Sequence, residues 1–141
     1  MTDSIHFKIQ NGTGIIHLNR PKVLNAFDLE MATLFLDKLK EWKINKTIKR
    51  VLLVGEGKAL CAGGDIKSLF FSSDISKLKQ IFFKKEYTLN YAISQFPKPY
   101  MSIWDGIVMG GGIGLSIHGN IRLASEKTKF AMPETAIGFF P

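Results

Sequence analysis

Two glycine clusters are the first candidates for chemistry. The first is Gly63-Gly64, followed by Asp65, and the second is the run 110–114, Gly-Gly-Gly-Ile-Gly. Each is expected to lie between a strand and a helix. Glycine lets the backbone approach a ligand closely, and the first N–H groups of a helix have no partner within it. Two such N–H groups from separate loops can together stabilise one developing oxyanion.

Neither cluster has the order of a phosphate-binding loop. The second lacks G-x-G-x-x-G spacing, and no G-K-[ST] sequence is present. A single glycine cluster also has a simpler interpretation, a tight turn that glycine tolerates best. Two clusters in equivalent contexts favour the oxyanion site without settling the choice.

Two glutamates are candidates for acid–base work. Glu134 follows Met132-Pro133 and has mainly apolar neighbours in sequence, so burial would raise its pKa and suit a general base or nucleophile. The alternative is a glutamate that complements a helix dipole. Glu86 stands beside Lys84 and Lys85, and this pattern alone favours a solvated ion pair.

Cys61, the single cysteine, is a possible nucleophile for thioester cleavage. None of the three histidines forms a local catalytic signature with it, so a packed thiol is the favoured interpretation. A histidine beside glycines, such as His118, is also more often structural than catalytic. No Cys/His cluster has zinc spacing, and we expect no metal.

The pattern of apolar residues predicts the strands and helices that would position the glycine clusters and the glutamates. A hairpin is expected from 5–10 and 14–18, and an amphipathic helix over 28–43 with Asp28 as its N-cap. The other expected strands are 51–54, 100–104, 121–124 and 129–131, and the other helices are 66–70, 75–96, 112–118 and a last turn from 132. Segments 55–65 and 105–112 are expected to be a loop and a turn. Alternating strands and helices predict an α/β fold.

Composition limits the function classes. The chain has 141 residues, of which 45% are hydrophobic and 22% charged, as expected for one globular domain. No apolar run is long enough to span a membrane, and no signal peptide is visible. The net charge of +7 favours anionic partners. Aromatic residues are not interleaved with basic ones, so a nucleic-acid surface is not favoured.

Several segments together resemble the crotonase (enoyl-CoA hydratase/isomerase) superfamily. The resemblance is carried by its opening signature at 18–26 and its two oxyanion-hole segments at 57–67 and 105–112. Segments 82–87, 109–119 and 130–141 are similar to the 3-hydroxyisobutyryl-CoA hydrolase branch. Gly114 stands where hydratases have a second catalytic glutamate, which disfavours hydration by paired glutamates.

The resemblance implies a crotonase-like spiral of ββα units, incomplete at the C-terminus, with 1–141 as the N-terminal part of the domain. The family continues after Pro141 with an aspartate and a glycine pair, so a fragment or a truncated product is expected. The implied activity is hydrolysis of a CoA thioester, most closely 3-hydroxyisobutyryl-CoA in valine catabolism. CoA belongs to the substrate, so no separate cofactor is expected.

Residue roles also follow from the resemblance. The N–H groups of Gly64 and Gly111 would hold the thioester oxygen, Glu134 would act as base or nucleophile, and Glu86 would line the acyl pocket. Further expected substrate-binding residues are Lys22, Val23, Leu24, Ala26, Ala62, Asp65, Ile66 and Lys67. We expect an acyl-CoA substrate, no nucleic-acid or membrane partner, and an oligomer only for the complete chain. The expected location is the cytoplasm, or the mitochondrial matrix for a processed eukaryotic chain.

Two alternatives remain open. The first is an enoyl-CoA hydratase or isomerase, of which an isomerase with one glutamate fits Gly114 better. The second is a CoA-binding remnant without catalytic activity, because a chain truncated after Pro141 is expected to show little or no hydrolysis by itself.

Overall fold

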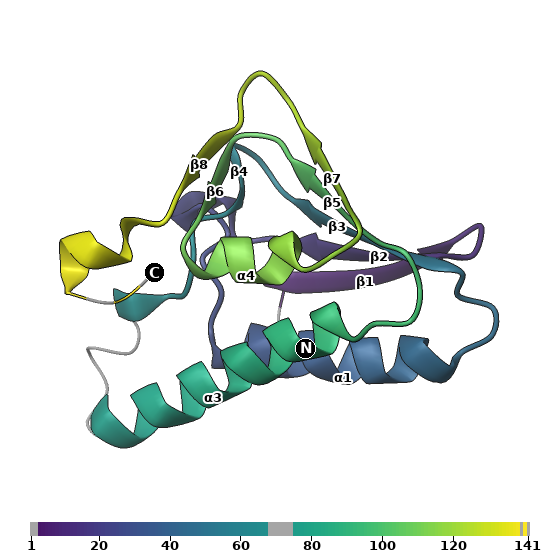
Figure 1. Cartoon of the computed structure of the whole chain (residues 1–141), viewed down its shortest axis with the longest axis horizontal. Coiled ribbons are helices and arrows are strands. Elements are labelled where there is room, and N and C mark those ends of the chain that lie inside the picture. Colours follow the sequence, from purple (N-terminus) through teal and green to yellow (C-terminus); the bar gives the residue numbers. More distant parts are fainter. Residues whose placement is uncertain (1–2, 68–74, 139, 141) are drawn as a thin grey trace.

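The computed structural model describes residues 3–67, 75–138 and 140. The chain alternates strands with helices, which confirms the α/β expectation (Figure 1). In order the elements are β1 (Ile5–Gln10), β2 (Thr13–Leu18), η1 (Pro21–Val23), α1 (Leu29–Ile44), β3 (Arg50–Gly55), β4 (Ala59–Cys61), α3 (Ile75–Ser94), β5 (Tyr100–Trp104), β6 (Ile107–Met109), α4 (Gly111–Ile117), β7 (Ile121–Ala124), β8 (Lys129–Ala131) and η2 (Pro133–Ile137).

The strands form two sheets. One has the order β1-β2-β3-β5-β7 and the other the order β4-β6-β8. Only the β1–β2 hairpin is antiparallel, and the remaining pairs are parallel. In Figure 1, β3, β5 and β7 rise to one apex, and β4, β6 and β8 descend from it. The repeated order of strand, strand and helix is the expected spiral of ββα units.

Two short strands were not expected. Segments 59–61 and 107–109, predicted as parts of a loop and a turn, are β4 and β6. Three residues are too few to show an alternating pattern, and all three residues of β4 are buried, so polarity gives no signal. The helical turn expected over 66–70 lies largely outside the described residues.

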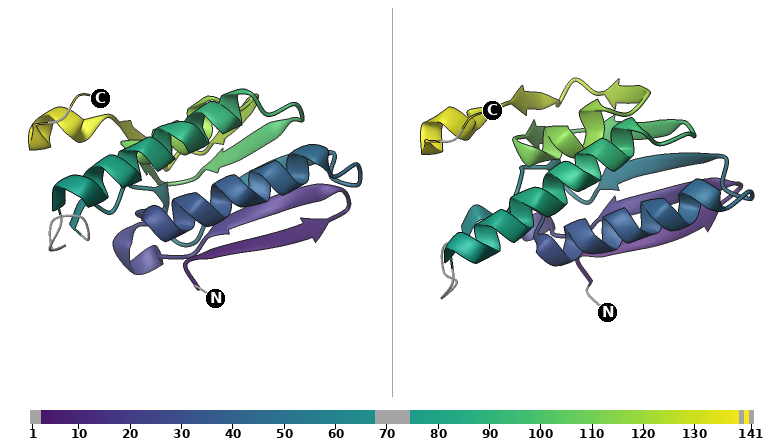
Figure 2. Two further views of the ribbon diagram at one scale, coloured as in Figure 1. Left: turned by 90° about the horizontal axis from the view of Figure 1, so that it is seen from below. Right: turned by 60° about the horizontal axis from the view of Figure 1, so that its bottom comes forward.

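Two long helices cover the large sheet side by side (Figure 2). Asp28 is the N-cap of α1, because its Oδ1 accepts a 2.9 Å hydrogen bond from the backbone N–H of Met31. The buried face of α1 presents Met31, Ala32, Phe35, Leu36, Leu39 and Trp42 to the core. Among the described helices none is both long and apolar enough to cross a membrane.

Candidate active site

The two glycine clusters lie against each other. Gly63 has a φ of +113°, and a Cβ added there would lie 3.4 Å from the backbone nitrogen of Gly111. Phe27 fixes the first cluster, since its N–H donates a 2.9 Å hydrogen bond to the carbonyl of Gly63. The second cluster joins β6 to α4. The fold therefore brings together two segments that are almost fifty positions apart in sequence.

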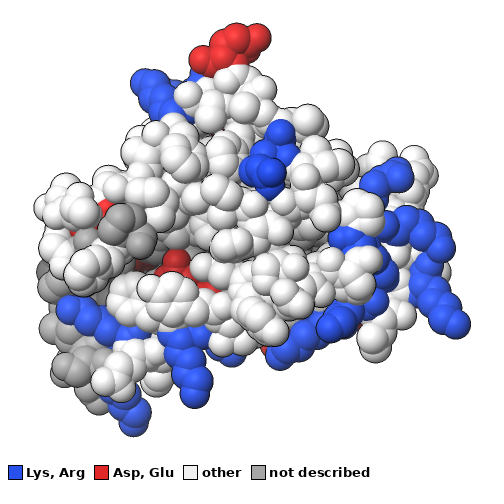
Figure 3. Space-filling model, in the orientation of Figure 1, with Lys and Arg blue, Asp and Glu red and all other residues white. Residues whose placement is uncertain are grey.

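A cavity of about 830 Å³ opens beside these clusters. Gly64 and Gly111 both line it, and neither N–H donates to a backbone or side-chain acceptor within the described part of the chain. The surface view shows acidic atoms within a hollow on this side of the molecule (Figure 3). Most of the remaining wall is apolar and includes Phe82, Ile113 and Met132.

Glu86 is buried in this cavity wall, with 7% of its surface exposed. It shares the buried face of α3 with Phe82, Leu89 and Ile93. Burial, and secondly the charge of Glu134, raise the pKa of Glu86 from 4.5 to about 7. The ion-pair interpretation of Glu86 is therefore wrong. Glu86 follows Phe82 by four residues and precedes Leu89 by three. This spacing puts the three side chains on one face of a helix and was the available sequence signal.

Glu134 reaches the same cavity from η2. Its Oε1 would lie 3.1 Å from a Cβ added to Gly110. Its Oε2 is buried and has no hydrogen-bond partner among the described residues. An unpaired, buried carboxylate oxygen is costly unless a ligand or water satisfies it. Both carboxylates therefore lie beside the second glycine cluster, Glu86 against Gly111 and Glu134 against Gly110.

Cys61 is not part of the cavity lining. The thiol is fully buried, and its sulfur accepts a 3.4 Å hydrogen bond from the N–H of Gly63. Burial raises its pKa to about 12, so the thiolate needed for attack is not available at neutral pH. The packed-thiol interpretation is confirmed.

The segment between β2 and α1 borders the first glycine cluster. The N–H of Ala62 donates a 2.9 Å hydrogen bond to the carbonyl of Leu24. Of the further residues expected to bind substrate, Ala62 and Ile66 line the cavity. The cavity lining does not include Lys22, Val23, Leu24, Ala26, Asp65 or Lys67. Lys22, Val23 and Lys67 are exposed.

Asp65, expected to bind substrate, has a partner within the chain. Its Oδ2 lies 2.9 Å from Nη2 of Arg20, and Nη1 of Arg20 donates a 2.7 Å hydrogen bond to the carbonyl of Ala26. Arg20 thus ties the segment after Gly64 to the loop that precedes α1. In this arrangement the carboxylate of Asp65 supports the loop.

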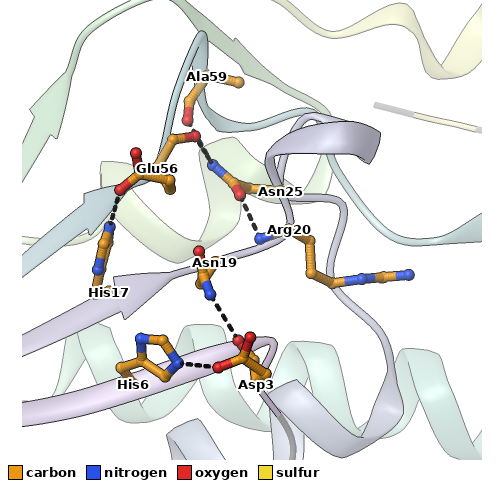
Figure 4. Close-up of polar contacts among 8 residues, drawn as sticks. All are labelled: Asp3, His6, His17, Asn19, Arg20, Asn25, Glu56 and Ala59. Atoms are coloured by element: carbon orange, nitrogen blue, oxygen red, sulfur yellow. Dashed lines mark hydrogen bonds and ion pairs between the residues drawn. The ribbon is translucent and has the colours of Figure 1, made fainter.

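Asn25 fastens the same loop to the segment before β4 (Figure 4). Its Nδ2 donates hydrogen bonds of 2.8 Å to the carbonyl of Glu56 and 2.7 Å to that of Ala59. Its Oδ1 accepts one of 2.8 Å from the N–H of Arg20. The side chain is fully buried and the backbone φ is +56°, a region that asparagine tolerates better than most residues.

Replacing Asn25 with alanine is expected to lower the free energy of unfolding by about 2–4 kcal/mol, because buried backbone groups lose their partners. Urea unfolding followed by circular dichroism measures this change. Asn11→Ala is the matched control, since Asn11 has a similar φ of +49° in an exposed turn. Equal losses in both variants would attribute the effect to backbone strain and contradict a role for the Asn25 hydrogen bonds.

Asn90 is a polar cavity residue that the sequence analysis missed. Asn90 lines the wall one helical turn after Glu86, and its Oδ1 is buried without a partner among the described residues. An asparagine in mid-helix at i+4 from a buried glutamate was the available signal. His118, expected to be structural, also contributes to the cavity lining. In residues 3–67, 75–138 and 140, no group of three or more His, Cys, Asp or Glu could hold a metal ion.

Known proteins share both the sequence and the fold. The enoyl-CoA hydratase/isomerase family matches residues 13–141. The 3-hydroxyisobutyryl-CoA hydrolase, mitochondrial, of Xenopus laevis is 52% identical over 130 residues, or 91% of this chain and 34% of the relative. The human protein of that name is 49% identical over 134 residues, again 34% of its length. The chain thus spans about a third of the length of these curated relatives.

Among solved structures, a carnitinyl-CoA dehydratase from Mycobacterium thermoresistibile superimposes with a TM-score of 0.95 and 42% identity. The match covers 99% of this chain and 42% of that structure. An enoyl-CoA hydratase from Rhodobacter sphaeroides gives the same TM-score at 35% identity, with the same coverage of 99% and 42%. The spiral of ββα units and the match over residues 13–141 lead to one assignment: the chain belongs to the enoyl-CoA hydratase/isomerase family.

Proposed function

We propose that this site hydrolyses a CoA thioester, with 3-hydroxyisobutyryl-CoA as the substrate and 3-hydroxyisobutyrate and CoA as the products. The observation that carries the proposal is one cavity lined by two glutamates, Glu86 and Glu134, and by Gly64 and Gly111, whose N–H groups have no acceptor among the described residues. The names of the hydrolase relatives support the thioester class and the acyl group.

In the proposed mechanism, backbone N–H groups bind the thioester before the reaction begins. The thioester oxygen accepts hydrogen bonds from the N–H groups of Gly64 and Gly111, which stabilise it as it becomes an oxyanion. Glu134 either removes a proton from the attacking water or attacks the carbonyl carbon itself. In the first route the water oxygen forms the new C–O bond as the C–S bond breaks, and the proton taken by Glu134 passes to the CoA thiolate. In the second route a carboxylate oxygen of Glu134 forms the new C–O bond and CoA leaves as the thiolate, which is protonated by the water consumed in the next step. In the second route water then hydrolyses the acyl-enzyme anhydride.

The nucleotide end of CoA is proposed to lie toward Lys22 and Lys67, which are exposed on the segments bordering the first glycine cluster. Replacing both lysines with alanine is expected to weaken binding of the CoA ester by about 3- to 10-fold. Calorimetric titration with CoA at low and high salt measures the change, which should shrink as salt screens the charges. Lys46→Ala with Lys49→Ala removes the same charge from the segment after α1, and an equal loss there would contradict a local contact.

A pair of substrates tests the proposed function. The purified chain is incubated with 3-hydroxyisobutyryl-CoA and, separately, with crotonyl-CoA. We expect free CoA thiol from the first ester and no hydration of the second. Hydration or isomerisation without thiol release would favour the hydratase/isomerase alternative. Binding without any turnover would favour the CoA-binding alternative, and both results would overturn the hydrolase proposal.

The place in valine catabolism and the location belong to the same proposal. The curated relatives are named mitochondrial. The mitochondrial matrix, for a processed eukaryotic chain, is therefore better supported than the cytoplasm. Fractionation of cells that produce the protein, followed by detection in the matrix fraction, tests this location.

A further inference from the structure

Asn90 lies against Gly114, the last glycine of the second cluster. It lies on α3 one turn after Glu86, and both residues line the cavity. Its side chain packs flat against α4, since a Cβ added to Gly114 would lie 2.5 Å from Nδ2 and 3.0 Å from Oδ1. The absence of a side chain at Gly114 is therefore what gives the carboxamide its place.

The carboxamide is also unsatisfied. Its Oδ1 is buried and has no hydrogen-bond partner within the part of the chain that the structure describes. Buried polar groups in folded proteins nearly always have partners, and an exception in a cavity wall points to a ligand or a bound water. A carboxamide can donate and accept at once, which matches a hydroxyl group better than a carboxylate or an ammonium group.

The position of the carboxamide fixes which part of a ligand it can meet. Gly111 and Gly114 both belong to α4, and three residues of helix advance by about 4.5 Å. If a thioester oxygen is held at Gly111 and the acyl chain extends along α4, its β-carbon comes toward Gly114. A substituent on that carbon would then face Asn90.

We infer that Asn90 selects acyl groups that carry a hydroxyl on the carbon β to the thioester. The inference rests on the proposed function only for the position of the thioester. Asn90 is a specificity residue that touches the acyl group, and it takes no part in breaking the C–S bond.

A matched pair of esters tests the inference. 3-Hydroxyisobutyryl-CoA and isobutyryl-CoA differ by one oxygen atom, and their dissociation constants are measured by calorimetry. The measurements use a Glu134→Gln background, so that hydrolysis does not consume the ester. We expect this parent to prefer the hydroxy ester by about 10- to 100-fold, the range expected for one buried hydrogen bond. Asn90→Leu should reduce the ratio to about one and leave the affinity for isobutyryl-CoA unchanged.

Two further variants keep the result interpretable if Asn90→Leu does not fold. Gly114→Ala keeps the chemistry of Asn90 but displaces its carboxamide, and should also lower the ratio. Tyr91→Leu changes an exposed neighbour on α3 outside the cavity lining, and should not change it. A parent with equal affinity for both esters, or with none for either, would overturn the inference. So would an unchanged preference in Asn90→Leu or, if that variant does not fold, in Gly114→Ala.

Failure of this inference can be distinguished from failure of the proposed function. Absence of thiol release by the wild-type chain would contradict hydrolysis but leaves the ratio of dissociation constants measurable. Thiol release with a ratio that is insensitive to Asn90 would keep the hydrolase and remove the assigned role of Asn90.

Discussion

Glu134→Gln is expected to lower kcat for thioester hydrolysis by at least about 100-fold, the usual cost of losing a general base or nucleophile. Glutamine preserves the shape of the side chain but is a poor proton acceptor and nucleophile. Because glutamine has the same size as the glutamate it replaces in the cavity lining, the binding of the CoA moiety should change little. Thiol release measures kcat, and calorimetry with the intact ester measures binding.

The control for this variant is Glu126→Gln, which removes the same charge from an exposed position between β7 and β8. It should leave both kcat and affinity unchanged. If Glu134→Gln kept most of its turnover while Glu126→Gln behaved as expected, Glu134 would be neither base nor nucleophile. Another group, such as Glu86, would then have to activate the water.

The stability of the protein should depend on the protonation of Glu86. The pKa of this carboxyl is about 7 in the folded chain against 4.5 ordinarily, so the folded state binds an extra proton between these values. Stability therefore falls as pH rises from about 4.5 to 7, and the loss is complete above pH 7. The shift corresponds to roughly 3 kcal/mol at one pKa unit per 1.36 kcal/mol. Glu86→Gln, which stays neutral, should escape this loss.

Urea unfolding at pH 5 and pH 8 measures the effect as a difference between wild type and Glu86→Gln. Titrating groups that do not interact with Glu86 contribute equally to both proteins and cancel in that difference. Glu30→Gln, at an exposed position on α1, is the control and should follow the wild type at both pH values. Parallel stability curves for wild type and Glu86→Gln would show that Glu86 is ionised in the folded chain.

Much of this fold could be predicted from the periodic spacing of apolar residues and from the residues that cap helices or form turns. The apolar spacing of α1 and its Asp28 cap, and the Asn-Gly turn between β1 and β2, specify local structure without help from distant residues. β4 and β6 were missed because each has only three residues. They are recognised as strands by their backbone pairing, β4 with β6 and β6 with β8. Pairing between segments far apart in sequence leaves no local pattern.

In the site, too, features with a local sequence pattern were predicted and those that depend on distant residues were not. Glycine clusters before helices are a local signal, and the fold brings them to one cavity. Glu86 was placed wrongly from its lysine neighbours because adjacent residues on a helix point in different directions, and its true neighbours are Phe82 and Leu89. Asn90 was missed because its significance depends on Gly114 of α4, which lies twenty-four positions later.

The crowding around Gly111 limits what genetics can reveal about it. A Cβ at this position would overlap Oε1 of Glu86 and lie 2.8 Å from the ring of Phe27. A mutational scan would therefore score every side chain here as damaging, whether the amide contributes to catalysis or not. Only a backbone change, such as an amide-to-ester replacement by chemical ligation, separates the hydrogen-bond donor from the space it occupies.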